Sequence, residues 1–177
     1  LTLESAPLPP CAADMLRVQM HYAPINASDL IPITGAYRHR VAPPQVAGYE
    51  GVGTVVQAPS AFQHLLGKRV LPLRGMGCWQ RYVDVKAPLA IPVPDDITGT
   101  LAARAYINPL AALLMLKKWP VAGKNVLITA GGSACALLLA QWAQLQGANS
   151  VVVVHRSPAH AARLQAMGLD AVLESAT

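Results

Sequence analysis

An apolar run that ends in a glycine turn is the feature that most constrains the fold. Asn125–Ala130 is short and apolar, which is typical of a buried strand. Gly131-Gly132-Ser133 follows, and then a helix-favouring segment that Gly147 closes. Ser150–His155 contains four consecutive valines, which suit a second buried strand. This alternation predicts a βαβ unit with parallel strands.

The same alternation continues toward the end of the chain. Ser157 can cap a third helix with Pro158 at its first position, and Gly168 can end that helix. Ala171–Leu173 then begins another strand. A doubly wound sheet needs more strands than these to bury both of its faces. We therefore expect the sequence to be truncated at its C-terminus, and to lack residues before Leu1 as well.

Proline divides the chain near residue 100. Residues 1–100 hold 12 of the 15 prolines, which favours short strands and irregular loops over long helices. The sequence predicts a mostly-β domain over 1–100 and a partial α/β domain over 101–177. The strand-like runs of the first domain are Met15–Tyr22, Gly51–Gln57, Arg69–Leu73 and Gln80–Val85. Thr100–Trp119 favours a helix, in which Pro109 predicts a kink or a break between two helices.

Composition excludes several classes of protein. The chain is 53% hydrophobic and only 13% charged, which is too apolar for a disordered tail. The apolar run Ala134–Ala140 falls well short of the roughly 20 residues that a membrane span needs. Three cysteines without a C-x-x-C pair argue against a zinc ribbon and fit a reducing compartment. The net charge of +5 has no Lys/Arg run, so it favours an anionic small ligand over nucleic acid.

The turn after the first α/β strand is the candidate phosphate site. A helix N-terminus attracts phosphate through its unpaired N–H groups and partial positive charge. The dinucleotide fingerprint G-x-G-x-x-G becomes Gly131-x-Ser133-x-x-Ala136 here, so a Cβ stands at the middle position. The strand–turn–helix context favours phosphate binding over a plain turn without a ligand. The predicted contacts are Gly131, Gly132, Ser133, Ala134 and Cys135.

The end of the second α/β strand indicates which dinucleotide binds. NAD enzymes place an acid there, about 20 residues past the glycines, to hold the ribose hydroxyls. This chain has His155, Arg156 and Ser157 instead, and no acid between Gly147 and Leu169. A cation and a hydroxyl suit a 2′-phosphate, so the sequence predicts NADPH as the cofactor. The alternative is an ordinary solvated arginine at a strand end.

Three motifs resemble those of a known family. Ile25–Leu30 reads I-N-A-S-D-L, Gly48–Val55 reads G-Y-E-G-V-G-T-V, and Asn108–Ala112 reads N-P-L-A-A. They resemble motifs of the zinc-free medium-chain dehydrogenases/reductases, in the quinone oxidoreductase and 2-enoyl thioester reductase branches. The resemblance implies a GroES-like catalytic domain followed by a Rossmann dinucleotide-binding domain.

The resemblance also implies a metal-free site with a tyrosine donor. Zinc members carry Cys at the place of Asn26 and His at the place of Tyr49, and neither Asn nor Tyr is a usual zinc ligand. Gly35-Ala36-Tyr37 resembles the G-x-Y of the enoyl thioester reductases, which makes Tyr37 the expected acid or donor. Asn26 is expected to face the substrate pocket. The alternatives are a surface tyrosine and an ordinary turn asparagine.

Further roles follow from the resemblance. Trp79 is expected to wall the substrate pocket, although a buried tryptophan is more often core. Asn108 is expected near the nicotinamide, and Ala111 replaces a family threonine. For Glu50 we favour a structural role, hydrogen bonding a nearby backbone turn, over that of a general base.

The leading interpretation is an NADPH-dependent, metal-free reductase of an activated double bond in a 2-enoyl thioester, an enone or an enal. An NADPH:quinone oxidoreductase is the alternative, and a non-catalytic nucleotide-binding relative is the rival from another class. We expect a cytoplasmic homodimer acting on a small molecule, without nucleic-acid or membrane partners. A mitochondrial location is the option for a eukaryotic source.

Overall fold

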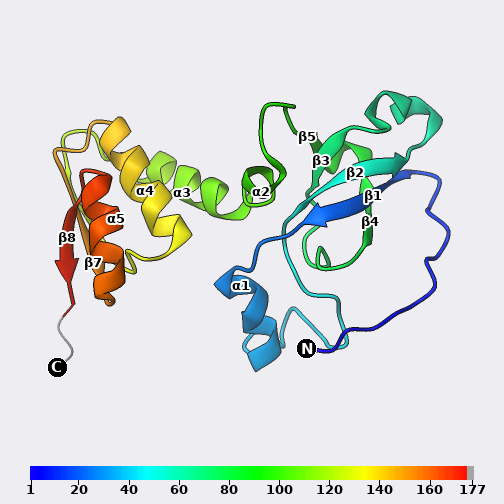
Figure 1. Ribbon diagram of the computed structural model, residues 1–177, viewed down its shortest axis with the longest axis horizontal. Coiled ribbons are helices and arrows are strands. Elements are labelled where there is room, and N and C mark those ends of the chain that lie inside the picture. The colour runs from blue at the N-terminus through cyan, green and yellow to red at the C-terminus, as the bar shows by residue number, and fades with distance from the viewer. Residues whose placement is uncertain (175–177) are drawn as a thin grey trace. The chain divides into compact units, whose positions relative to one another are not determined.

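The computed structural model describes residues 1–174, and its backbone divides into two compact units (Figure 1). Unit 1 is Leu1–Tyr106 and unit 2 is Ile107–Thr177. The first is built on an antiparallel sheet and the second on a parallel sheet with helices. This order confirms the predicted fold class, a mostly-β domain followed by an α/β domain. The division falls after Tyr106, whereas the proline content led us to expect it near residue 100.

Unit 1 is a five-stranded sheet in the order β4-β1-β2-β3-β5. All of its neighbouring strands are antiparallel. Buried and more exposed residues alternate along β3 and β4, so that one face of these strands packs inward. The strands are β1 (Met15–Tyr22), β2 (Val52–Gln57), β3 (Arg69–Pro72), β4 (Tyr82–Lys86) and β5 (Ala90–Pro92). The main buried side chains are Leu16, Val18, Val55, Val70, Val83 and Val85.

Short helical turns fill the connections of unit 1, where the proline content led us to expect irregular loops and no long helices. They are α1 (Ala27–Leu30), η1 (Ile31–Thr34), η2 (Ser60–Leu65), η3 (Ala87–Leu89) and α2 (Gly99–Ala102). The expected break in the helical segment 100–119 exists, but it precedes Pro109. The helix α3 (Ile107–Lys118) begins two residues before this proline. Proline is tolerated in a first turn because the N–H that it lacks has no intrahelical acceptor there.

Unit 2 is a three-stranded parallel sheet in the order β6-β7-β8, with helices between the strands. Its elements are β6 (Asn125–Ile128), α4 (Ala134–Leu145), β7 (Ser150–His155), η4 (Pro158–His160), α5 (Ala161–Ala166) and β8 (Asp170–Leu173). The predicted βαβαβ order is confirmed. Strand β6 ends at Ile128, two residues before the predicted end, since Ala130 already has a φ of 55° and belongs to the turn.

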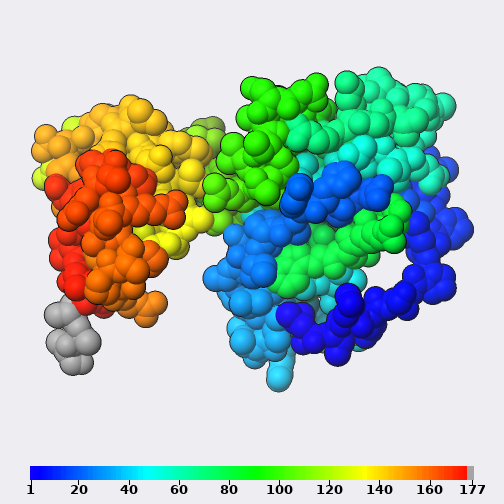
Figure 2. Space-filling view, in the orientation of Figure 1, coloured from blue at the N-terminus to red at the C-terminus, as the bar shows by residue number. Residues whose placement is uncertain are grey.

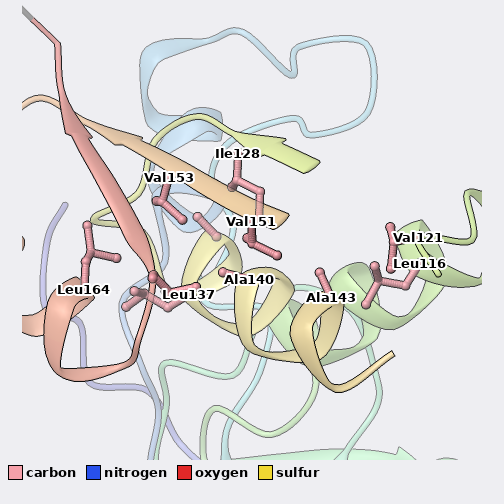
Figure 3. Packing of buried hydrophobic residues seen from close by; sticks show 11 residues of the cluster. Leu116, Val121, Ile128, Leu137, Ala140, Ala143, Val151, Val153 and Leu164 are labelled. Carbon is pink, nitrogen blue, oxygen red and sulfur yellow. The ribbon is translucent and has the colours of Figure 1, made fainter. Parts of the chain in front are cut away.

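One face of the parallel sheet carries the core of unit 2 (Figure 3). Val151 and Val153 of β7 point toward Leu137 and Ala140 of α4. Small residues on α4 let the helix approach the valine side chains closely. The opposite face is also apolar, and there Leu127 of β6 is 68% exposed. Within residues 1–174, this second face lacks the helical cover that the first one has.

An ion pair holds the start of β1 and the segment before it. Arg17 donates from Nε to Asp84 Oδ1 at 2.8 Å and from Nη2 to Oδ2 at 2.9 Å. The same Nη2 donates to the Pro9 carbonyl at 2.7 Å. The exposed N-terminal residues, dark blue in Figure 2, run over the outside of unit 1 up to this contact. No helix within the described residues is long and apolar enough to cross a membrane.

Replacing Asp84 by Asn should lower the stability of the full-length protein by about 1–3 kcal/mol at pH 7. The Arg17 hydrogen bonds hold the pKa of the Asp84 carboxyl below its usual range. A depressed carboxyl pKa stabilises the fold above about pH 4 and stops doing so as the pH falls through the folded-state value. The difference between parent and variant should therefore shrink as the pH falls below about 4. Thermal unfolding across this range measures it, with exposed Asp95→Asn as the control. A constant difference would contradict the ion-pair explanation.

Candidate active site and cofactor turn

A buried aspartate joins the two most specific motifs. Asp29 is 1% exposed. Its Oδ2 accepts from the Asn26 backbone N–H at 2.6 Å, and its Oδ1 accepts from the Tyr49 N–H at 2.9 Å. Such charge-assisted bonds to backbone N–H groups are strong. Asp29 therefore fixes the start of α1 against the segment that leads into β2.

Glu50 orients the Asn26 side chain. The carboxylate is 3% exposed, and its Oε1 accepts from Asn26 Nδ2 at 2.7 Å. Its Oε2 accepts from the Tyr106 backbone N–H at 3.2 Å. Glu50 thus has the structural role that we favoured for it, hydrogen bonding a backbone turn. The sequence did not reveal that it also holds the predicted site residue Asn26.

Trp79 is anchored beside the same motif. Its Nε1–H donates to the Pro24 carbonyl at 3.1 Å, and the indole lies against Gly48, where a Cβ would overlap the ring. Gly48 has a φ of 89°, which favours glycine on conformational grounds as well. Trp79 and Ile25 line an open pocket of about 350 Å³. The tryptophan is half-buried, so one side of it packs and the other faces this pocket.

Cys78 lines the same pocket, and its thiol is protonated at neutral pH. Its side chain is 1% exposed, and burial raises its pKa to about 11. A nucleophilic cysteine needs a lowered pKa, because the thiolate is the reactive form. Cys78 is therefore a packing residue at neutral pH. Burial also raises the pKa of the Cys135 thiol in α4, which disfavours the reactive thiolate there as well.

Tyr37 lies in a basic loop that follows η1. The half-buried ring has the Arg40 guanidinium 5.8 Å from its centroid and the His39 ring edge-on at 6.1 Å. The Arg38 side chain folds onto Gly35, which has a φ of 79°. Among the described residues, no hydrogen bond joins Tyr37 to the other site residues of unit 1. The Arg40 guanidinium therefore places a positive charge near the Tyr37 ring.

No metal cluster gathers in the described chain. Residues 1–174 contain no group of three His, Cys, Asp or Glu side chains that are placed to hold a metal ion. At the family's zinc position, the Asn26 amide donates to Glu50, and the Tyr49 N–H donates to Asp29. A metal-free site remains a prediction from the residue types at positions 26 and 49.

The glycine turn connects β6 to α4 and is fastened to β7. The Gly131 N–H donates to the Val154 carbonyl at 2.9 Å, and the Ser133 N–H donates to the Ala130 carbonyl at 2.9 Å. Ser133 is the N-cap of α4, and its Oγ accepts from the Ala136 N–H at 3.1 Å. The Ala134 and Cys135 N–H groups belong to the first helical turn, where intrahelical acceptors are lacking. They face outward from the helix end, as a phosphate site requires.

His160 is the residue of this turn that the sequence interpretation missed. Its imidazole lies against Gly132, where a Cβ would overlap three of the ring atoms. Gly132 is followed by Ser133 in the turn, whereas His160 ends η4 after the next strand. Only the parallel pairing of β6 with β7 brings the two loops together. No local motif carries that information, and we had assigned no role to this histidine.

Of the three residues predicted to bind the 2′-phosphate, one is buried and two lie nearer the surface. His155 is 3% exposed, and its Nδ1–H donates to the Ser157 carbonyl at 2.9 Å. Its imidazole therefore supports the loop. Arg156 is exposed, and Ser157 is half-buried and caps η4 through its Oγ. Asn108 lies half-buried in the first turn of α3, at the start of unit 2.

Replacing Gly132 by Ala should destabilise the full-length protein by about 1 kcal/mol, because the new methyl group forces the half-buried His160 ring to move. Removing the ring in the double variant Gly132→Ala/His160→Ala should restore much of the loss. Two residues in contact show such coupling, and separated residues do not. Thermal unfolding of the two single variants and the double variant measures it. Strictly additive losses would contradict this contact.

Comparison with known proteins identifies the first unit. Residues 12–95 match the alcohol dehydrogenase GroES-like domain. A mitochondrial enoyl-[acyl-carrier-protein] reductase of Arabidopsis thaliana is 33% identical over 162 residues, which cover 88% of this chain and 43% of the relative. The chain thus spans less than half the length of that relative.

Solved structures match the chain over both of its units. A "putative NADPH:quinone reductase" from Bacillus thuringiensis has a TM-score of 0.87 and 41% identity, covering 95% of this chain and 51% of that one. The quinone oxidoreductase of Thermus thermophilus, also solved in complex with NADPH, has a TM-score of 0.81 and 26% identity, covering 96% and 54%. The resemblance of the three motifs to medium-chain dehydrogenases/reductases is thereby confirmed, and residues 12–95 belong to the alcohol dehydrogenase GroES-like domain family.

Proposed function

We propose that this chain carries the catalytic and cofactor-binding residues of an NADPH-dependent reductase. Its substrate is an activated double bond in a 2-enoyl thioester, an enone or an enal. The observation that carries the proposal is the turn Ala130–Ser133 at the N-terminus of α4, fastened beside Arg156 at the end of β7. The relatives named enoyl-[acyl-carrier-protein] reductase and NADPH:quinone reductase support the same class.

The residues of unit 2 fit a dinucleotide with a 2′-phosphate. Gly131 and Gly132 allow the turn to pack closely against its neighbours, because a Cβ at either position would overlap neighbouring atoms. The α4 N-terminus offers N–H groups to the pyrophosphate, and Arg156 offers a cation to the 2′-phosphate. Ser133 adds a Cβ where the fingerprint has glycine, but its side chain is turned into the N-cap bond. Bound NADPH supplies a hydride to the substrate carbon.

Unit 1 supplies the groups that balance the charge on the substrate. Hydride addition to a conjugated carbonyl leaves an enolate oxygen, which needs hydrogen-bond donors and then a proton on carbon. Tyr37 is proposed to donate from its phenol to that oxygen, with Arg40 and His39 raising the local potential. Asn26 is proposed as a second polar group, held in one orientation by Glu50. Trp79 is proposed as a wall of the pocket.

A quinone is the second candidate substrate. Ala111 stands where the family motif has threonine, so one expected polar contact to the cofactor or the substrate is lost, which leaves the quinone open. Quinone reduction also places negative charge on a conjugated oxygen, so the same donors serve both reactions. The structural neighbours named as quinone reductases support this second candidate.

Binding of NADPH and its oxidation by substrate test the proposal. The full-length protein should gain about 2.7 kcal/mol of stability at 100 times Kd of NADPH, because ligand binds the folded state alone. It should then oxidise NADPH when a 2-enoyl thioester is added. Protection without turnover of an enoyl thioester, an enone or a quinone would favour the non-catalytic relative. Absence of protection would overturn the cofactor assignment.

The remaining expectations belong to the same proposal. They are a small-molecule substrate, a homodimer, a metal-free site and a cytoplasmic location, with the mitochondrion as the eukaryotic option. The residue types at positions 26 and 49 support the metal-free site, and the sparse cysteines fit a reducing compartment.

A further inference from the structure

The loop that follows η1 is basic and contains no acid. Residues 35–41, called here the basic loop, include the exposed arginines Arg38 and Arg40. No aspartate or glutamate occurs between Asp29 and Glu50. Both of these carboxylates are buried and already accept hydrogen bonds. The sequence neighbours of the basic loop therefore do not balance its charge.

The rest of the described chain does not balance this charge either. Neither Arg38 nor Arg40 forms an ion pair with any residue of 1–174. A guanidinium presents its N–H donors in a planar fork, which matches the oxygens of a carboxylate or a phosphate. The two side chains are therefore available to an anion from outside the chain.

Backbone hydrogen bonds hold the basic loop in a compact turn. The Gly35 carbonyl accepts from the Arg38 N–H at 3.2 Å, and the Tyr37 carbonyl accepts from the Arg40 N–H at 2.8 Å. The Gly35 N–H in turn donates to the Pro32 carbonyl at 3.1 Å and so ties the loop to η1. An ordered turn thus carries both arginines.

Both arginines lie close to Tyr37, the proposed donor to the substrate oxygen. The Arg40 guanidinium is 5.8 Å from the centroid of the Tyr37 ring. The Arg38 guanidinium lies against Gly35, two residues before Tyr37. A substrate that accepts a hydrogen bond from the Tyr37 phenol has its remaining part within reach of these cations. An acidic group on that part gains a charge-assisted contact, whereas a neutral substrate gains none.

We propose that Arg38 and Arg40 bind an acidic group of the substrate, a carboxylate or a phosphate that lies beyond the reacting double bond. The inference rests on the proposed function and narrows it. The substrate is an enone that carries a carboxylate or an enoyl thioester that carries a phosphate, and not a neutral enal or quinone. The two arginines bind and select this substrate, and Tyr37 remains the donor to the developing enolate.

NADPH is the other anion in the reaction, and its binding has to be measured separately. Positive charge that serves the cofactor acts on the reduction of every substrate alike. Positive charge that serves the substrate acts only on substrates with an acidic group. The KM of NADPH in each variant separates these two roles.

Two pairs of substrates isolate the acidic group. The crotonyl thioesters of phosphopantetheine and of pantetheine differ only by the phosphate. Acetylacrylate and its methyl ester are both conjugated enones, and only acetylacrylate carries a carboxylate. Each variant is compared with the parent on the same substrate, so differences in intrinsic reactivity cancel. The two pairs also distinguish a phosphate from a carboxylate as the bound group.

Arg38→Gln and Arg40→Gln each remove one charge and keep a polar side chain. Arg81→Gln is the matched control, since Arg81 is another exposed arginine of unit 1. Its guanidinium lies 5.8 Å from the centroid of the Tyr82 ring, as that of Arg40 does from Tyr37. Each variant is made in the full-length protein. Thermal unfolding without ligand shows whether it folds.

Steady-state kinetics give the answer. In at least one pair, Arg38→Gln should raise the KM of the charged substrate about 5- to 10-fold relative to its neutral partner, the size of a charge-assisted contact at an exposed position. The loss falls on KM because a contact remote from the reacting carbon is made equally in the ground state and the transition state. Arg40 contacts the Tyr37 ring, so Arg40→Gln is evaluated only through the ratio of kcat/KM for the charged and neutral substrates. Arg81→Gln should match the parent on every substrate.

Three results would overturn the inference and leave the proposed function standing. The first is the absence of a selective loss on either charged substrate in both loop variants. The second is an equal loss in Arg81→Gln, which would show that the overall field of the protein attracts the substrate. The third is a raised KM of NADPH with every substrate, which would assign the basic loop to the cofactor. A parent protein that reduces none of the substrates would overturn the proposed function along with the inference.

Discussion

Tyr37→Phe should lower kcat for a 2-enoyl thioester by about 10²–10³, with the affinity for NADPH little changed. The substitution keeps the ring with its contacts to Arg40 and His39 and removes only the hydroxyl. A donor to a developing oxyanion is worth more in the transition state than in the ground state, so its loss falls on kcat. Steady-state kinetics of the full-length protein measure the effect.

Tyr82→Phe is a closely matched control. Tyr82 is also half-buried, and the Arg81 guanidinium lies 5.8 Å from its ring centroid, as Arg40 does at Tyr37. Loss of its hydroxyl should leave kcat unchanged. For a quinone, the loss at Tyr37 should be smaller, because the reduced product is a more stable anion. An unchanged rate with a 2-enoyl thioester would make Tyr37 structural and place the quinone function ahead.

Periodic patterns made the fold predictable. The valine run of β7 and the glycine turn before α4 specify a parallel βαβ unit through local residue types alone. The strand β5 (Ala90–Pro92) was not predicted, since it has only three residues, the last of them a proline, and shows no alternation. Pro109 misplaced the helix break for a related reason. Proline is excluded from the interior of a helix but fits its first turn. The residues around Pro109 do not show which of these two positions it takes.

The candidate site was only partly predictable, because its residues act through partners that are distant in the sequence. Asn26 was predicted from its motif, but the carboxylate that orients it comes from Glu50 at the entrance to β2. His155 looked like a cofactor residue at a strand end, yet its imidazole is buried under the following turn. Alternation along a strand decides which of two neighbours faces inward, and the chemistry of the side chain does not reveal it.

The exposed neighbour, Arg156, leads to the second large effect. Arg156→Ala should weaken NADPH binding about 10- to 100-fold, the size of a lost charge-assisted contact to phosphate. NADH lacks the 2′-phosphate, so its affinity should change far less. The residue is exposed at the end of β7, and its removal leaves the buried His155 and the core valines in place.

Arg163→Ala is the matched control for this variant. Arg163 is an exposed arginine in the same unit, on α5, so the two substitutions change the net charge equally. If the basic excess of the protein attracts NADPH only through its overall field, both variants should weaken binding by a similar, salt-sensitive amount. A specific contact predicts a loss confined to Arg156→Ala and to NADPH. Equal losses with NADPH and NADH in that variant would instead show that this arginine does not read the 2′-phosphate.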